Sequence, residues 1–201
     1  MKKVIYFLAA MAVVAGLASC KCTRDNNILV PEKTIAVDSV KVAEIAVADS
    51  ADYVWYETSV EYDNFFDEDT TFVVSKVASV FQEIKKDSTG IDTKVYVFTH
   101  ELGVEDVMPD PIDTFVIEDM PLDKAQIVLT FADAMGRMYM ANYPKPHSRQ
   151  VVLRKEVGPK PGVNPQYIFG NTEAQLYVDA VTGDVTDTKP VFDFEKVEVV
   201  K

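Results

Sequence analysis

The stretch that decides the fold is Ala174-Gln175-Leu176-Tyr177-Val178-Asp179-Ala180-Val181-Thr182-Gly183-Asp184-Val185. Its first half alternates apolar and polar side chains, which predicts a β-strand with opposite faces in different environments. Gly183 accepts a positive φ without the steric penalty of a Cβ atom, which favours a type I turn with a glycine bulge. The short polar side chains of Asp179 and Thr182 bond readily to nearby backbone amides, so we expect them to hold this turn.

The elements before this strand carry a resemblance to a known family. Residues 121–139 have a helical pattern that opens with Pro121-Leu122-Asp123-Lys124-Ala125, and residues 150–157 and 166–170 predict strands. A helix, two strands and a strand ending in Tyr-Val-Asp-Ala-Val-Thr-Gly-Asp-Val resemble, over residues 119–188, the PepSY-like, β-lactamase-inhibitor-like domains of bacterial secreted lipoproteins. PepSY domains accompany secreted proteases, so the resemblance implies a protein-binding, inhibitory or regulatory module. Two features depart from the family pattern: Pro121 stands where a serine or threonine cap is usual, and the loop 142–148 is long and rich in proline.

The first nineteen residues have the pattern of a lipoprotein signal peptide. Two lysines precede a mostly apolar segment at 4–17, which is too short for a comfortable transmembrane helix. Leu17-Ala18-Ser19-Cys20 then resembles a bacterial lipobox, which implies acylation at Cys20 and a stable membrane anchor. The alternative is an ordinary cleaved signal peptide followed by a chance cysteine. Because Lys21 is not the aspartate that retains enteric lipoproteins in the inner membrane, we expect an outer-membrane location in the cell envelope.

Charge and cysteine content exclude several classes of function. The chain has 201 residues with 32 acidic and 20 basic side chains, a net charge of −12, which disfavours nucleic acid and anionic membrane surfaces as partners. Cys20 and Cys22 are the two cysteines, so acylation of Cys20 leaves no pair for an intrachain disulfide. The alternatives for this C-x-C pair are a metal site and a strained disulfide bridge. Both are disfavoured, since the sequence has no His or Cys cluster elsewhere.

The composition divides the mature chain into four parts. Residues 20–50 lack large aromatics and predict a tether, with a docked strand or helix over 34–47 as the alternative. Residues 51–118 predict a first helix-and-sheet unit, with strands at 53–62, 94–100 and 113–118. Within this unit we expect a helix from residue 69 or 70, because five apolar residues share one helical face: Val73, Val77, Val80, Phe81 and Ile84. The β-branched pair Val73 and Val74 favours a strand instead.

The remaining residues complete the predicted fold. Residues 119–188 form the PepSY-like unit, and residues 189–201 predict a tail or an edge strand. The helix at 121–139 is expected to bury a stripe consisting of Leu122, Ala125, Val128, Leu129, Ala132 and Met135. The fold class is therefore α+β, an antiparallel sheet with helices packed on one face. The order of elements also suggests two similar units that share one continuous sheet.

No pattern in the sequence predicts catalysis or a cofactor. The acidic loop 63–69 is a calcium candidate, but it lacks EF-hand spacing, and a solvated acidic loop is the preferred interpretation. His100 and His147 are too few for zinc, and a triad with Ser75 or Ser148 has no nucleophile elbow to support it. The aromatic residues of 53–66 are expected in the core, with an exposed binding platform as the alternative.

We therefore expect a lipid-anchored envelope protein without enzymatic activity, cofactor or metal. Its expected partners are the membrane, through the lipid, and an envelope protein or a protease. The alternatives from other classes are an envelope hydrolase or metal-dependent enzyme, and a purely structural envelope component.

Overall fold

The computed structural model describes residues 28–63, 72–84, 93–112, 120–146, 148–155, 163–170 and 174–189. Within them the chain has a mixed α+β fold with two α-helices, a short 3-10 helix and an open antiparallel sheet of seven strands. The helices are α2 (Pro31–Asp49), η1 (Lys124–Gln126) and α3 (Phe131–Met140). The strands are β1 (Asp52–Tyr62), β2 (Val74–Ile84), β3 (Val95–Glu101), β4 (Gln150–Arg154), β5 (Gln166–Gly170), β6 (Gln175–Asp179) and β7 (Val185–Thr186).

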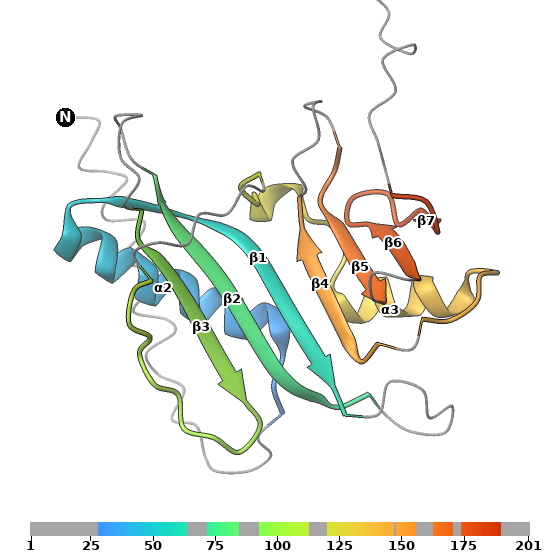
Figure 1. Ribbon diagram of the computed structural model, residues 1–201, viewed down its shortest axis with the longest axis horizontal. Coiled ribbons are helices and arrows are strands. Elements are labelled where there is room, and N and C mark those ends of the chain that lie inside the picture. Colours follow the sequence, from blue (N-terminus) through green and yellow to red (C-terminus); the bar gives the residue numbers. More distant parts are fainter. Residues whose placement is uncertain are drawn as a thin grey trace, which may run out of the picture.

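The strand order joins the two halves of the chain in one sheet. The order is β3-β2-β1-β4-β5-β6-β7, so β1 and β4, which are distant in sequence, lie side by side in the middle of the sheet (Figure 1). Their antiparallel register pairs Val60 with Val151 and Glu57 with Arg154. Hydrogen bonds between β1 and β4 therefore join the two expected units, residues 51–118 and 119–188, which confirms the prediction of one continuous sheet.

Helix α2 corrects the prediction of a tether over residues 20–50. Pro31 occupies the first turn, where its missing N–H costs no hydrogen bond, and Ser50 ends the helix in the left-handed region with φ +54°. Ile35 and Val42 are buried, and they share a face at i and i+7. The tether prediction failed because a helix that buries only one stripe needs no aromatic residues. The alternative of a docked helix over 34–47 is confirmed, and residues 20–27 lie outside the described residues.

Strand β2 corrects the prediction of a helix that begins near residue 69 or 70. Val77 and Phe81 are buried on the side of the sheet that faces the core, whereas Val80 points to the opposite side. The spacing of the apolar residues in this segment fits both the 3.6-residue period of a helix and the two-residue period of a strand, so the sequence pattern alone could not choose between them. Pairing decides the outcome, because β2 exchanges backbone hydrogen bonds with β1 on one edge and β3 on the other.

Helix α3 is shorter than the predicted helix at 121–139. It begins after Thr130, whose hydroxyl accepts the N–H of Asp133 at 3.1 Å, while the Asp133 carboxylate accepts the N–H of Thr130 at 3.1 Å. This capping box starts the helix ten residues later than predicted. The predicted stripe is accordingly wrong in part: Leu122 and Met135 are buried, but Ala125, Val128 and Ala132 are exposed. The residues that α3 buries are Phe131, Ala134, Met135 and Met138.

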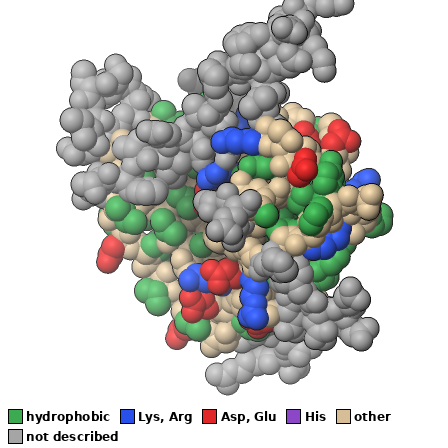
Figure 2. All heavy atoms as spheres, turned by 45° about the vertical axis from the view of Figure 1, so that its right-hand side comes forward, with side chains coloured by type: hydrophobic (Ala, Val, Ile, Leu, Met, Phe, Trp, Pro, Cys, Tyr) green, Lys and Arg blue, Asp and Glu red, His purple; other side chains and the backbone are tan. Residues whose placement is uncertain are grey.

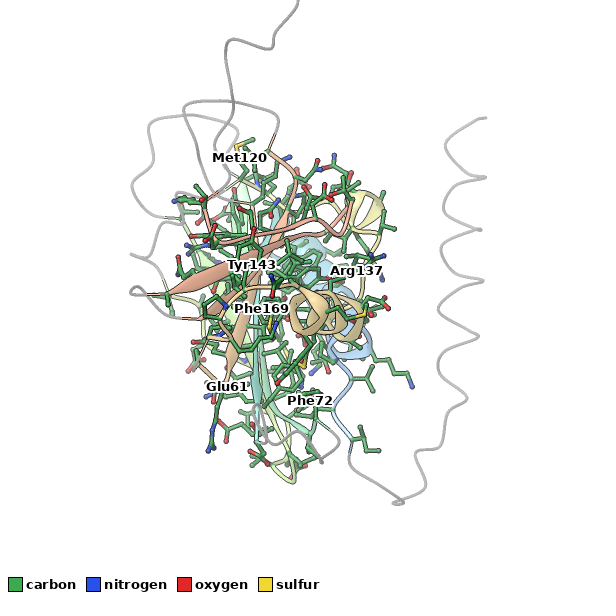
Figure 3. All side chains as sticks on the ribbon, turned by 90° about the vertical axis from the view of Figure 1, so that its right-hand side faces the viewer. Glu61, Phe72, Met120, Arg137, Tyr143 and Phe169 are labelled. Atoms are coloured by element: carbon green, nitrogen blue, oxygen red, sulfur yellow. The ribbon has the colours of Figure 1, made fainter. Side chains whose placement is uncertain are left out.

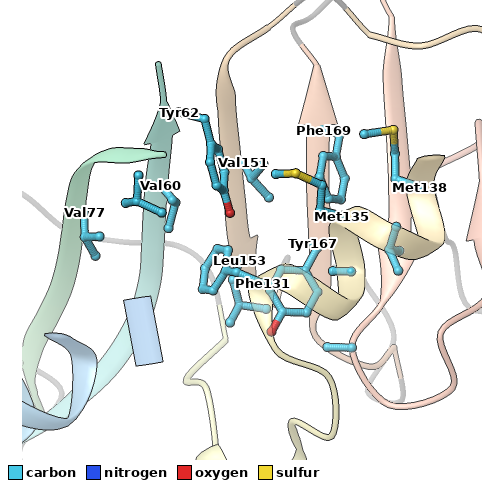
Figure 4. Close-up of a cluster of buried hydrophobic side chains, with 14 of the residues drawn as sticks. Val60, Tyr62, Val77, Phe131, Met135, Met138, Val151, Leu153, Tyr167 and Phe169 are labelled. Atoms are coloured by element: carbon cyan, nitrogen blue, oxygen red, sulfur yellow. The ribbon is translucent and has the colours of Figure 1, made fainter. Parts of the chain in front are cut away.

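The core combines side chains from both helices and most strands (Figure 4). Ile35 of α2 and Phe131 of α3 belong to the same buried cluster as Val60 of the central strand β1. Phe169 of β5 lies next to α3 (Figure 3). A second, smaller cluster under the C-terminal half of α2 consists of Val42, Phe81, Tyr96 and Phe98. Most of the stability of the fold comes from burying this apolar surface.

The remaining expectations divide between confirmed elements and segments outside the described residues. The strands predicted at 53–62, 94–100 and 166–170 and the strand before the Gly183 turn are confirmed within a residue or two. The strand predicted at 150–157 is observed over Gln150–Arg154. Tyr56 and Tyr62 are buried, as the core interpretation of the aromatic segment predicts. The expected strand at 113–118, residues 156–157 of the strand at 150–157, the acidic loop beyond Asp63 and the tail from residue 190 lie outside the described residues.

Candidate functional site

A buried histidine between two carboxylates is the most chemically distinctive feature of the described residues. His100 Nε2 lies 2.7 Å from Asp38 Oδ1, and His100 Nδ1 lies 2.7 Å from Asp106 Oδ1. The three residues come from α2, β3 and the loop after β3. The Asp38 side chain is fully buried and that of His100 nearly so, whereas Asp106 lies at the surface, where Lys41 Nζ approaches its second oxygen at 3.9 Å.

Local structure explains how these groups meet. Asp38 lies three residues after Ile35 and four before Val42, so it belongs to the buried stripe of α2. His100 follows Tyr96 and Phe98 on the same face of β3, and alternation therefore directs its ring towards α2. Each ring nitrogen faces a carboxylate oxygen, and both can donate hydrogen bonds only when the ring carries two protons.

The electrostatics of the site centre on Asp38. Burial raises the pKa of its carboxyl above 3.8 because desolvation disfavours the charged form. The hydrogen bond from His100 opposes this rise by stabilising the carboxylate. Ser79 and Lys41 also lower the pKa, although among the described residues no group donates a hydrogen bond to Asp38 Oδ2. A buried carboxylate with one strong partner depends heavily on that partner for its stability.

A polar chain lies in the core beside this carboxylate. Trp55 Nε1 donates to Thr58 Oγ1 at 2.9 Å, and Thr58 Oγ1 donates to Ser79 Oγ at 3.2 Å. Thr58 and Ser79 are fully buried on adjacent strands, where unpaired hydroxyls would be costly. The hydrogen bonds between them satisfy these groups, so the chain is explained as part of the packing.

The arrangement does not assemble the serine triad considered from the sequence. Ser75 Oγ donates to the carbonyl of Glu61 at 3.2 Å, and Ser148 Oγ accepts the N–H of Gln150 at 3.1 Å. With carboxylates on both ring nitrogens, His100 has no nitrogen free to take a proton from a hydroxyl in this arrangement. His147 lies outside the described residues. Among the residues that are described, no three His, Cys, Asp or Glu side chains are arranged to hold a metal ion.

The predicted turn is confirmed in its geometry. Gly183 has φ +79°, and its N–H donates to the carbonyl of Asp179 at 2.9 Å. Asp179 Oδ1 accepts the amides of Val181 and Thr182 at 2.8 and 2.9 Å, and Thr182 Oγ1 accepts the amide of Asp184 at 3.2 Å. These bonds are all internal to the turn, which gives its residues a structural role.

The tertiary structure adds contacts to this turn that the sequence did not indicate. Asn164 Nδ2 donates to both carboxylate oxygens of Asp179, at 3.1 and 3.0 Å. The carbonyl of Ala180 accepts the amides of Val128 and Leu129, at 2.9 and 3.1 Å. The turn therefore joins two other segments of the second half, which explains why this stretch organises that half.

A small pocket lies where the starts of the two helices meet the sheet. Glu32 Oε1 accepts the N–H of Phe131 at 2.8 Å, so the first turn of α2 caps the N-terminus of α3. Tyr167 donates its hydroxyl proton to the carbonyl of Leu129 at 2.6 Å. The pocket encloses about 150 Å³ and is mostly apolar; its lining consists of Glu32, Ile35, Trp55, Lys124, Ile127, Val128, Leu129, Thr130, Phe131, Leu153 and Tyr167. Its size suits a group no larger than a single aromatic ring.

The expected lipid anchor and the relation to known proteins remain to be considered. Cys20 and Cys22 precede the described residues, so lipidation stays a prediction. In the ranges that the structure describes, no helix has both the length and the apolar character needed to cross a membrane. Comparisons with protein-family models, curated proteins and solved structures find no significant match to this chain.

Proposed function

We propose that the protein is a lipid-anchored, non-catalytic component of the bacterial cell envelope that binds another envelope protein, in the manner of a PepSY-like module. The lipobox ending at Cys20 supports the anchor. The order of elements supports the PepSY-like assignment. The histidine cluster supports a structural role for His100, because a carboxylate oxygen lies at hydrogen-bond distance from each ring nitrogen.

The observation that carries the binding role is the accessible part of the sheet face over β1 to β3. In Figures 1 and 3 both helices lie on the same side of the sheet. On the opposite side, a cross-strand row joins the small side chains of Ser59, Ala78 and Thr99 over β1 to β3. Ser59 and Ala78 are half-buried and Thr99 is exposed, so this half of the face is accessible to another protein. Over β4 and β5 the same row continues into Val152 and the buried Ile168, so the accessible part of the face lies over the first three strands.

The arrangement of elements also supports two similar units. The order α2-β1-β2-β3 in the first half corresponds to α3-β4-β5-β6 in the second. In the sheet, β1-β2-β3 and β4-β5-β6 run outward from the centre in opposite directions. This correspondence supports the expectation of two similar helix-and-sheet units.

Membrane anchoring is tested in native cells by comparing Cys20→Ser with the matched control Cys22→Ser. We expect Cys20→Ser to enter the soluble fraction and to escape lipoprotein signal peptidase, and Cys22→Ser to behave as the unchanged chain. Normal processing and membrane retention of Cys20→Ser would show that the lipid anchor does not exist.

Partner binding is tested by crosslinking the full chain in native cells and identifying captured proteins by mass spectrometry. We expect one envelope protein to be enriched, and we expect purified protein to hydrolyse no ester or peptide in a generic panel. Hydrolysis that disappears in a His100→Gln variant would overturn the non-catalytic assignment, and capture of no envelope protein would overturn the binding role.

A further inference from the structure

The loop that follows β3 exposes an unusual number of apolar side chains. Val104, Val107 and Met108 retain 60%, 79% and 52% of their accessible surface, and Leu102 and Ile112 are also exposed. Single exposed apolar residues are ordinary on protein surfaces, but several in one loop mark an interaction site. Figure 1 shows this loop running back along the outer edge of β3. We call residues 102–112 the edge loop.

Three contacts hold the edge loop against the body of the protein. At its start, the N–H of Leu102 donates to the carbonyl of Ser75 at 2.8 Å. At its centre, Asp106 Oδ1 lies 2.7 Å from His100 Nδ1. At its end, Ile112 and Val95 exchange two backbone hydrogen bonds of 2.9 and 3.1 Å. A loop that is already fixed loses little conformational freedom when it binds a partner.

Protection of the sheet edge does not account for the apolar side chains. Pro109 and Pro111 have no N–H, so they prevent the edge loop from extending the ladder beyond the Val95 pair. A polar loop with the same prolines would block the edge equally well. The exposure of Val107 and its apolar neighbours therefore requires a separate explanation, and a partner that buries them supplies one.

The charge of the edge loop indicates the chemistry of that partner. The edge loop contains three acidic residues, Glu105, Asp106 and Asp110, and no lysine, arginine or histidine, and Glu101 at the end of β3 adds a fourth acidic residue beside it. Glu101 pairs with Lys76, and Asp106 with His100 and Lys41. Within the described part of the chain, Glu105 and Asp110 form no ion pair. Complementary charge favours a basic surface around an apolar cleft.

Together these observations support one assignment. We propose that the edge loop is the docking loop through which the protein binds a basic envelope protein, and that Asp106, bound to His100, positions it. The assignment rests on the proposed binding function and goes further by adding a contact surface at the edge of the same sheet, beside β3, and by naming the charge of the partner. A membrane surface is disfavoured as the occupant, because anionic lipids repel the acidic side chains of the loop.

The test places a photo-crosslinking benzoylphenylalanine in the full chain in native cells, at Val107 or at the control position Val47. The two valines match in exposure, at 79% and 81%, but Val47 lies near the end of α2. We expect Val107 to capture the envelope protein found by crosslinking of the whole chain, with Lys and Arg outnumbering Asp and Glu in that protein. Val47 should give at least tenfold less of this adduct.

Charge and positioning variants sharpen the test. The double variant Glu105→Lys/Asp110→Lys should lower the adduct at Val107 at least tenfold, whereas Glu44→Lys on the exposed side of α2 should not. Asp106→Ala should lower the adduct, and Asp106→Asn should restore it, since the amide oxygen still accepts a hydrogen bond from His100. Loss of fold alone would lower the adduct without rescue by Asp106→Asn.

The outcomes separate the two proposals. If crosslinking of the whole chain captures a partner that Val107 does not contact, or contacts no better than Val47, the docking loop is wrong and the binding function stands. An acidic partner, or an adduct insensitive to the charge reversal, also overturns the docking loop. If no envelope protein is captured by the whole chain, both proposals are wrong.

Discussion

Removing His100 should cost more stability than any single exposed ion pair in this protein. In His100→Leu, Asp38 keeps its fully buried carboxyl group but loses the hydrogen-bonding ring nitrogen at 2.7 Å. Breaking a buried pair from one side costs about 3–5 kcal/mol, because a charge remains without compensation. Asp106→Asn removes a charge on the solvent side, where a pair contributes about 1 kcal/mol or less.

The ionisation of Asp38 supplies an internal control. Burial raises its folded-state pKa above 3.8, and losing His100 raises it further. Between 3.8 and the raised value, the folded state holds a proton that the unfolded chain has released, so stability falls as pH rises through that interval. Asp38→Asn/His100→Leu lacks this carboxyl. The double variant should therefore be more stable than His100→Leu at pH 7, and the difference between their free energies of unfolding should be smaller at pH 5.

The assay is urea unfolding followed by the fluorescence of Trp55, the single tryptophan. The free energies of unfolding of the unchanged chain, both single variants and the double variant are compared at pH 7 and pH 5. Equal destabilisation by His100→Leu and Asp106→Asn would refute the claim that the buried pair depends on His100. A double variant no more stable than His100→Leu at pH 7 would show that an uncompensated carboxylate is not the cause.

Three further predictions concern backbone, capping and truncation. Gly183→Ala should cost about 1–2 kcal/mol, and Gly170→Ala should destabilise the fold more, because a Cβ at Gly170 would clash with the backbone carbonyl oxygen of Ala174; equal urea midpoints would contradict this. Thr130→Ala should cost about 1 kcal/mol and return the lowered pKa of Asp133 towards 3.8 in an NMR titration. In the unchanged protein this stabilisation is present above pH 3.8 and is lost as pH falls through the lowered pKa; an unshifted Asp133 titration in the variant would contradict the capping role. A chain that starts at Asp49 should show no cooperative unfolding, because α2 is missing from the core; a sharp transition would mean that α2 is dispensable.

The sequence predicts the second half of the fold better than the first. The alternation before Gly183 and the polar residues around it determine the β6 strand and its turn through local interactions alone. The first half contains valine-rich segments whose apolar pattern fits the period of a helix as well as that of a strand. For β2 the choice depends on hydrogen bonds to β1 and β3, and no local pattern contains that information.

The histidine cluster also has one part that the sequence indicates and one part that only the fold determines. Asp38 is an acidic residue in the apolar stripe between Ile35 and Val42, and this pattern could have indicated a buried partner once the segment was taken as a helix. The identity of the partner could not be predicted, because Asp38 and His100 are 62 positions apart in the chain.

Sequence alone therefore determined the features that depend on neighbours along the chain: the lipobox pattern, the overall acidic charge, most strands and the Gly183 turn. The tertiary structure decided the features that depend on distant residues: the helical state of residues 31–49, the strand state of β2, the meeting of Asp38 with His100, and the placement of the edge loop. The physical reason is that side-chain periodicity and turn geometry act over a few residues. Burial and cross-strand pairing act between segments that only the fold brings together.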